Sequence, residues 1–169
     1  MSFKEIKPEE LKENPFTMIG KDWLLITAGT KECCNTMTAS WGGLGVMWGK
    51  PSATVYIRQS RYTKEFVDKE EYFTISVMEE SYREALKLCG TVSGRECDKM
   101  KEVGISAFEM EKSVGISEAR IVMLCKKQYC QFMGPEGFTQ QENDEKWYGD
   151  KDYHTMYIAS VEKVFIKEA

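Results

Sequence analysis

Short segments with the composition of β-strands recur along this chain, and they constrain its fold more than any other feature. They are rich in β-branched and aromatic residues, and turn-forming residues such as Gly20, Gly42-Gly43 and Pro51 bound several of them. Six such strands are expected, at residues 22–27, 35–41, 52–58, 72–77, 119–131 and 153–166. Because the helical patterns between them are few and short, the sequence predicts a mainly β fold, a β-barrel with short peripheral helices.

The expected helices are marked by capping boxes and by apolar residues at helical spacing. The boxes Ser81–Glu84 and Ser93–Glu96 each predict a helix start. A third helix is expected from Thr63, and a single turn is expected within residues 7–14. The acidic run 142–146 is interpreted as a solvated loop.

Length and charge exclude several functional classes. With 169 residues, no linker and no internal repeat, the chain is expected to form one domain over residues 1–169. Its net charge of −4 argues against general nucleic-acid binding, and no apolar run is long enough to span a membrane. The charged N-terminus does not resemble a secretory signal, so a cytoplasmic protein is expected.

Metal and thiol chemistry find little support in the residue counts. One histidine, His154, and six cysteines without a C-x-x-C pair predict no metal site. The cysteines are interpreted as small buried hydrophobic residues, although the vicinal pair Cys33-Cys34 has a redox role as its alternative. His154 is either a structural residue or a hydrogen-bond donor or proton source beside a redox centre.

Two local patterns are typical of anion sites. Residues Arg58–Thr63 end a strand and open a helix, so two arginines, hydroxyls and free helix-start amides would converge on a phosphate. The alternative is a solvated strand end with surface arginines. The tripeptide Ser93-Gly94-Arg95 combines a hydroxyl, a glycine that permits close backbone approach and a cation, with an ordinary capped helix as its alternative.

The polar segment 35–43 suggests a place for a flat ligand. Its side chains offer hydrogen-bond donors and acceptors, while Ala39 and the paired glycines leave room for a heteroaromatic ring against the backbone. The alternative is a glycine-rich turn after an edge strand.

Taken together, these segments resemble the flavin reductase-like, FMN-binding split-barrel family, and most closely its flavoredoxin-type branch. The matching stretches are NTMTASWGGLG (35–45), KPSATVYIRQSRYTKEFV (50–67), FTIS (73–76), LCGTVSGRECDKM (88–100), EARIVMLCKKQY (118–129) and DYHTMYIASV (152–161). They cover nearly the whole chain in the family's order, which makes the resemblance specific. The sequence departs from the branch at Gln59, where a proline is expected, and the loss of that rigid residue is expected to loosen the phosphate turn.

The resemblance implies a Greek-key split barrel that forms a homodimer and binds FMN at the dimer interface. Residues expected to line the flavin ring and ribityl chain are Asn35, Thr36, Thr38, Ala39, Ser40 and Trp41. Residues expected to hold the phosphate are Arg58, Ser60, Arg61, Tyr62 and Thr63, closed over by Ser93, Gly94, Arg95 and Lys99. His154, the candidate catalytic residue, is expected near the flavin or the nicotinamide.

The leading functional hypothesis is an FMN-dependent NAD(P)H:flavin oxidoreductase. NADH or NADPH would pass a hydride to flavin N5, and the flavin would pass electrons onward. The first alternative is a flavoredoxin-like electron carrier that keeps FMN bound, does not oxidise nicotinamide and receives electrons from a redox protein partner. A second alternative is a split barrel that binds a different planar molecule.

Overall fold

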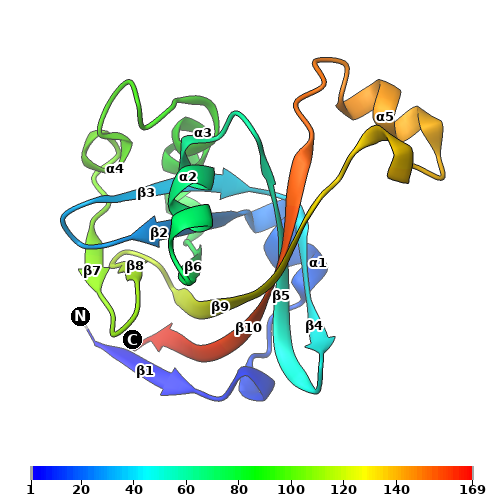
Figure 1. Ribbon diagram of the computed structural model, residues 1–169. Coiled ribbons are helices and arrows are strands. Elements are labelled where there is room, and N and C mark those ends of the chain that lie inside the picture. The colour runs from blue at the N-terminus through cyan, green and yellow to red at the C-terminus, as the bar shows by residue number, and fades with distance from the viewer. Residues whose placement is uncertain (1, 169) are drawn as a thin grey trace.

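A large antiparallel sheet forms the frame of the protein, of which the computed structural model describes residues 2–168 (Figure 1). The strands of this sheet are β1 (Phe3–Ile6), β2 (Leu24–Gly29), β3 (Cys34–Ala39), β4 (Gly42–Met47), β5 (Lys50–Arg58), β6 (Tyr72–Val77), β9 (Ile121–Phe132) and β10 (His154–Lys167). They lie in the order β3-β2-β6-β9-β10-β5-β4, and β1 pairs with the C-terminal part of β10. A separate hairpin is formed by β7 (Ala107–Glu109) and β8 (Val114–Ile116). The predicted mainly β fold is confirmed.

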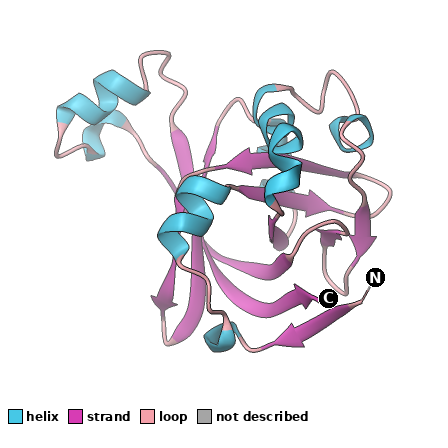
Figure 2. Ribbon diagram, turned by 180° about the vertical axis from the view of Figure 1, so that it is seen from behind, coloured by secondary structure: helices cyan, strands magenta, loops and turns pink. Residues whose placement is uncertain are grey.

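Short helices surround the sheet. They are α1 (Pro15–Thr17), α2 (Tyr62–Lys69), α3 (Arg83–Thr91), α4 (Lys99–Glu102) and α5 (Gln141–Trp147). Seen from both sides, α5 stands apart from the other helices, on the segment that connects β9 with β10 (Figure 2). Helix α2 and a 3₁₀ turn at Pro8–Glu10 confirm two of the helical predictions. No helix within residues 2–168 is long and apolar enough to cross a membrane.

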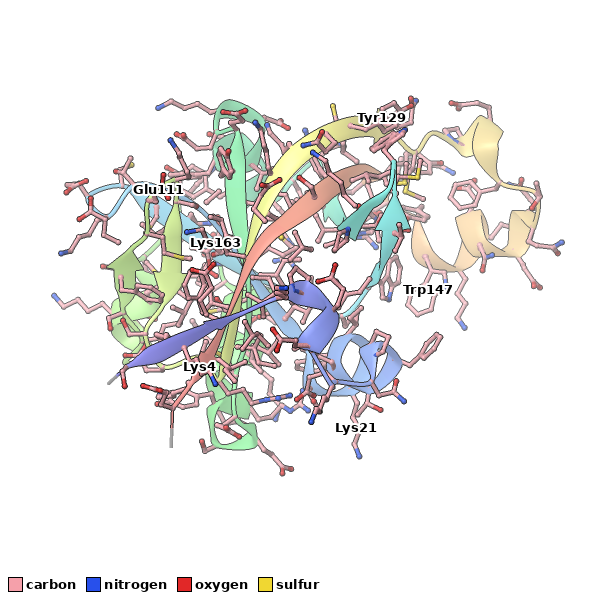
Figure 3. The ribbon with its side chains drawn as sticks, turned by 90° about the horizontal axis from the view of Figure 1, so that it is seen from below. Lys4, Lys21, Glu111, Tyr129, Trp147 and Lys163 are labelled. Carbon is pink, nitrogen blue, oxygen red and sulfur yellow. The ribbon has the colours of Figure 1, made fainter. Side chains whose placement is uncertain are left out.

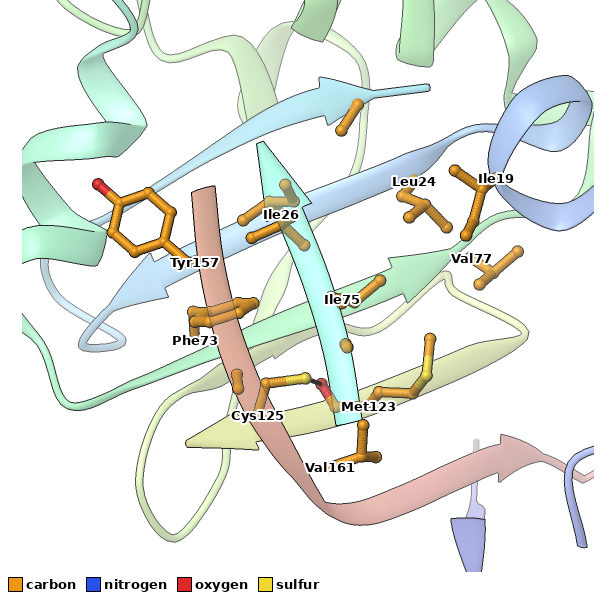
Figure 4. Close-up of a cluster of buried hydrophobic side chains, with 14 of the residues drawn as sticks. Ile19, Leu24, Ile26, Phe73, Ile75, Val77, Met123, Cys125, Tyr157 and Val161 are labelled. Atoms are coloured by element: carbon orange, nitrogen blue, oxygen red, sulfur yellow. Dashed lines mark hydrogen bonds between the residues drawn. The ribbon is translucent and has the colours of Figure 1, made fainter. Parts of the chain in front are cut away.

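The sheet curls so that strands from its two ends pack around one hydrophobic core. Every second residue of a strand points to the same face, and the inward residues of β6 are Phe73, Ile75 and Val77 (Figure 4). The same core takes Met37 from β3 and Val55 from β5, which lie near opposite ends of the sheet. Strands β3 and β5 therefore meet without pairing, and a seam runs between them.

A second cluster covers the outer face of the central strands. Leu25 of β2 and Val122 of β9 pack there against Leu86 and Cys89 of α3 and against Ile116 of β8. Strand β2 is consequently buried on both faces, and all of its residues are inaccessible. Burial on both faces explains why its sequence is almost uninterrupted in apolar residues instead of alternating.

The prediction that Gly42-Gly43 ends a strand is wrong, because these glycines begin β4. Gly42 pairs with Val55 of β5, and a Cβ atom at position 42 would lie 2.9 Å from the carbonyl oxygen of Thr54. Glycine at this position therefore allows the two strands to approach closely, because it has no Cβ atom.

Both capping-box predictions are wrong about where the helix begins. Helix α3 begins at Arg83, after a 3₁₀ turn that contains Ser81, and no side chain caps it. Residues 93–96 form a turn in which the Glu96 amide donates to the Ser93 carbonyl oxygen at 3.0 Å. Helix α4 begins only at Lys99, and Asp98 caps it by accepting from the amide of Lys101. In the second case the helix starts at a cap five residues beyond Ser93.

The acidic run 142–146 is not a loop, and this prediction too is wrong. It belongs to α5, and one of its members, Asp144, is only 4% exposed. The Asp144 carboxylate accepts hydrogen bonds from the Tyr153 hydroxyl at 2.7 Å and from the Gln141 amide at 3.2 Å. These bonds compensate the burial of its charge and hold α5 to the start of β10.

The cysteines are not uniformly buried. Cys89 and Cys125 are buried, as predicted, but Cys33 and Cys130 are exposed. Cys33 lies in the turn between β2 and β3, and Cys130 lies on the part of β9 that extends beyond its pairing with β6. The interpretation as buried hydrophobic residues is therefore wrong for these two.

Candidate functional site

Two connected cavities lie along the seam between β3 and β5. The first, here named the β3 cavity, has a volume of about 250 Å³ and is lined by residues 37–41, Tyr56, Arg58, Arg61, Trp147 and His154. The second, here named the α2 cavity, has a volume of about 260 Å³ and is lined by Met37, Arg58, residues 60–63, residues 91–94 and Lys99. Met37, Arg58 and Arg61 line both, so the two form one elongated site. Thirteen of the predicted site residues line it: Thr38, Ala39, Ser40, Trp41, Arg58, Ser60, Arg61, Tyr62, Thr63, Ser93, Gly94, Lys99 and His154.

Two cations in the α2 cavity are not neutralised by the protein. Within residues 2–168, neither Arg61 nor Lys99 forms an ion pair with a carboxylate. Lys99 is only 3% exposed, and its Nζ donates to the carbonyl oxygen of Cys89 at 3.1 Å. Burial lowers the pKa of both side chains, and the charge of Arg61 lowers the pKa of Lys99 further. A buried lysine and a half-buried arginine, neither paired with a carboxylate, favour an anion.

Helix α2 adds its N-terminus to the same cavity. Arg61 occupies the N-cap position with an extended backbone, and no side chain caps the first turn. The free amides and the helix dipole at this end favour negative charge. The prediction that Arg58–Thr63 ends a strand and opens a helix is thereby confirmed.

Asn35 and Gly94 meet at a close contact beside the α2 cavity. The Asn35 amide donates to the Thr63 hydroxyl at 2.7 Å, which fastens β3 to the start of α2. A Cβ atom at position 94 would lie only 2.1 Å from Asn35 Oδ1, so the 91–99 segment can pack on this junction only with glycine there. Asn35 lines neither cavity, and it contributes by holding Thr63 and contacting Gly94, which do line the α2 cavity.

The guanidinium of Arg58 holds the segment that precedes β10. It donates to the carbonyl oxygens of Asp152 at 2.8 Å and of Trp147 at 2.9 Å. Asp152 in turn accepts from the Ser60 hydroxyl at 2.5 Å and from the Ser60 amide at 3.1 Å. Asp152 is a site residue that sequence reasoning missed, although it adjoins the predicted His154.

Arg95 and Thr36 are the other predicted site residues that line neither cavity. Arg95 pairs with Glu65, donates to the Ser60 carbonyl oxygen at 3.2 Å and stacks over the ring of Tyr62. Thr36 is fully buried, and its hydroxyl lies 2.9 Å from that of Thr27 on β2. Arg61 and Lys99 therefore carry the charge that the protein leaves available.

Gln59 ties the turn that the missing proline was expected to loosen. Its side-chain amide donates to the Thr155 hydroxyl at 2.8 Å and to the Tyr153 carbonyl oxygen at 3.3 Å. Its backbone amide also donates to the Tyr153 carbonyl oxygen, at 3.2 Å. A proline has no amide hydrogen for this last bond. The turn is thus fixed by hydrogen bonds to β10.

His154 lies buried at the wall of the β3 cavity in its neutral form. Burial, and then the charge of Arg58, lower its pKa to about 4. Its Nδ1 lies 2.6 Å from the hydroxyl of Tyr148, and its ring lies 5.1 Å from that of Trp41 between centroids. Burial raises the pKa of Tyr148, so this phenol is protonated near neutral pH and shares a hydrogen bond with Nδ1, whose direction is set by which ring nitrogen carries the proton. His154 is therefore an uncharged hydrogen-bonding residue of the β3 cavity wall.

The comparisons with known proteins agree with this arrangement. A family model described as a flavin reductase like domain matches residues 19–169. The chain belongs to the flavin reductase-like family. Comparison with curated proteins found no match.

Solved structures with this flavin reductase-like fold include three that are similar at low identity. The FMN-binding domain of a flavin reductases-like enzyme from Shewanella baltica OS155 has a TM-score of 0.69 and 17% identity, covering 98% of this chain and 77% of that one. Flavoredoxin of Desulfovibrio vulgaris (Miyazaki F) has a TM-score of 0.67 and 20% identity, and the match covers 86% of this chain and 69% of that one. The NADH:FAD oxidoreductase of Streptomyces globisporus C-1027 has a TM-score of 0.65 and 15% identity, and the match covers 86% of this chain and 75% of that one. At these identities the similarity shows the fold.

The flavin reductase-like chain also has a larger aromatic chamber that sequence reasoning missed. It is here named the α5 chamber, has a volume of about 560 Å³ and lies where the segment 133–148 faces α1 and β4. Trp147 lies between α5 and β4 (Figure 3) and meets the ring of Trp41 edge-on at 5.2 Å between centroids. The signal that could have found it is the set of aromatic residues at 138, 147 and 148, which flank the run 142–146 interpreted as a loop.

Proposed function

We propose that this flavin reductase-like protein binds FMN along the seam and transfers electrons from NADH or NADPH through it. The observation that carries the proposal is the uncompensated pair Arg61 and Lys99 at one end of an elongated cavity. The other end lies between a strand edge and aromatic side chains, as a flat ring requires. A molecule with a phosphate at one end and a planar ring at the other matches both.

The residues present fit this cofactor. A phosphate dianion would compensate Arg61 and Lys99 and accept from the first amides of α2, which together make strong charge-assisted bonds. Ala39 presents a small side chain in the β3 cavity, so a ring can lie close to the β3 backbone. The glycine at position 94 lets the 91–99 segment close over the same end.

FMN supplies the hydride and electron chemistry when it is bound. The protein supplies binding, orientation and electrostatics. Arg61 and Lys99 bind the phosphate, and Asn35 and Asp152 position the turns that carry the binding groups. His154 keeps a neutral ring with Nδ1 engaged by Tyr148, which leaves Nε2 for the ligand. Trp41 and Trp147 meet edge to face and line the ring end with apolar surface.

The test is an anaerobic titration of the FMN-saturated protein. Addition of NADH or NADPH is expected to bleach the visible flavin band, with complete bleaching by dithionite as the control. A flavin that dithionite bleaches but neither nicotinamide reduces would support the flavoredoxin-like carrier, with a redox protein as its electron donor. A protein that acquires no flavin spectrum after FMN addition would contradict both and support a different planar ligand.

Association of two chains is part of the proposal. Strand β4 lies at the edge of the sheet, and the apolar residues Val46, Met47 and Trp48 at its end are 75%, 40% and 58% exposed. An unpaired strand edge beside exposed apolar side chains favours association with a second copy. In sedimentation experiments, wild-type protein is expected to be a dimer and Val46→Lys to dissociate more readily. A monomeric wild-type protein would contradict this part.

A further inference from the structure

The α5 chamber, at about 560 Å³, is more than twice as large as either cavity of the seam, at about 250 and 260 Å³. Prolines, glycines, aliphatic side chains and aromatic side chains make up most of its wall, and the described residues that line it include no aspartate, glutamate, lysine, arginine or histidine. Phe138 and Trp147 are lining residues that come from the segment 133–148. Transfer of a charged group into such a chamber is costly, because no opposite charge compensates the lost hydration.

The α5 chamber adjoins the β3 cavity directly. Ser40, Trp41, Tyr56 and Trp147 line both of them. A molecule in the α5 chamber can therefore lie against a ring in the β3 cavity. Direct contact of this kind allows electrons to pass between the two bound molecules.

Several polar side chains of the α5 chamber wall have no hydrogen-bond partner within the described part of the protein. Within residues 2–168, the side chains of Ser40, Tyr56 and Asn143 form no hydrogen bond, nor do the indole N–H groups of Trp41 and Trp147, whereas the Tyr148 hydroxyl is engaged with His154. Hydroxyl and amide groups can all donate to a carbonyl oxygen. An apolar chamber with a few free donors is typical of a site for a small, mainly apolar ligand.

We propose that the α5 chamber binds the electron acceptor, and that this acceptor is a small uncharged conjugated carbonyl compound of the quinone class. The proposal rests on the proposed function, since it assigns the second substrate of the same site. The chamber wall offers no cation to the pyrophosphate of the dinucleotide donor, because no lysine or arginine among the described residues lines it, whereas Arg61 and Lys99 line the far end of the seam.

The redox step is balanced without a further reactant. NADH or NADPH loses a hydride and becomes the oxidised nicotinamide. The quinone gains two electrons and two protons and becomes the hydroquinone, one proton arriving with the hydride and the other from solvent. The Tyr56 hydroxyl and the Asn143 amide donate hydrogen bonds to the carbonyl oxygens as negative charge develops on them.

The kinetic test compares a neutral and an anionic acceptor of the same shape. FMN-saturated protein, reduced with dithionite, is mixed anaerobically with 1,4-naphthoquinone or with its 2-sulfonate. The neutral quinone is expected to reoxidise the protein at least about tenfold faster at low concentration, because burial of the sulfonate is unfavourable. The sulfonate group withdraws electrons, so driving force alone would reverse this order. Equal rates, or a faster sulfonate, would overturn the proposal.

The residue-level test uses Asn143→Asp, which adds a carboxylate of nearly the same shape to the chamber wall. Gln140→Glu is the matched control, because it adds the same charge beside the same helix but does not line the chamber. Asn143→Asp is expected to weaken naphthoquinone binding about tenfold, and Gln140→Glu to leave it unchanged. Binding is measured by quenching of tryptophan fluorescence in FMN-saturated protein. Equal effects of both variants would overturn the proposal.

Two further outcomes separate this proposal from its competitors. Displacement of quinone from the FMN-free protein by added FMN would show that the quinone occupies the seam instead, and would overturn it. A change in sedimentation of Asn143→Asp with unchanged quinone binding would assign the chamber to contact between two chains, and would overturn it too. Failure of FMN binding or of reduction by nicotinamide would instead contradict the proposed function, and dithionite reduction keeps that outcome distinct.

Discussion

Removal of the Arg61 guanidinium should weaken the binding of FMN but not of riboflavin. Arg61 lies where the α2 and β3 cavities meet, and the protein leaves its charge without an ion-pair partner. Riboflavin has the same ring and ribityl chain as FMN but lacks the phosphate. Arg61→Ala therefore removes only the interaction that distinguishes the two ligands.

The size of the effect follows from the surroundings of Arg61. A charge-assisted hydrogen bond contributes about 1.5–3 kcal/mol, which corresponds to a change in dissociation constant of roughly ten- to a hundred-fold. Loss of Arg61 also removes the repulsion that lowers the pKa of Lys99, so Lys99 holds its proton more firmly and compensates in part. We therefore expect the FMN dissociation constant to rise at least about tenfold, toward the lower end of that range.

Flavin fluorescence titrations with both ligands provide the assay. The control is Lys101→Ala, which removes a cation from the same helix as Lys99 but outside both cavities. It should leave both dissociation constants unchanged. Unchanged FMN affinity in Arg61→Ala would refute the phosphate assignment, and an equal loss for riboflavin would place Arg61 at the ring.

Three other changes test the surroundings of the seam. Because the pKa of His154 falls from 6.5 to about 4 on folding, the unfolded chain binds its proton first, and stability should decline as the pH falls from 6.5 to 4. His154→Gln should flatten this decline by at most about 1.4 kcal/mol per pH unit in urea titrations, and an unchanged slope would contradict the low pKa. Arg58→Ala should increase hydrogen exchange in residues 147–152, because two carbonyl oxygens lose their donor, and unchanged exchange there would refute that role. Gly94→Ala should cost about 1–3 kcal/mol in unfolding free energy, whereas Gly45→Ala, with open space around it, should cost less; equal losses would refute the close approach at position 94.

The sequence predicted the strands of the core because their residues have the composition of buried strands. Residues 72–77 and 52–58 combine β-branched and aromatic residues with clear boundaries, and the structure confirms both as β6 and most of β5. Strand β4 escaped prediction, because its glycines read locally as a turn. Only the strand that they approach reveals why a glycine is needed at position 42.

The candidate site could be predicted in part, because some of its signals are local. The change from strand to helix at Arg58–Thr63 and the cation Lys99 are visible in the sequence, and the structure brings them together. The engagement of Arg95 with Glu65 depends on a contact between distant segments and has no local signal. The α5 chamber was missed because the run 142–146 is interpreted from the sequence as a loop, whereas it forms part of α5, which the bond from Tyr153 to Asp144 holds to the start of β10.

A crystal structure of the protein with FMN would test the central claim most directly. The account predicts the phosphate within hydrogen-bonding distance of the Arg61 guanidinium and of Lys99 Nζ, with the ring in the β3 cavity beside Trp41 and His154. FMN bound with its phosphate elsewhere, or with its ring in the α5 chamber, would contradict it.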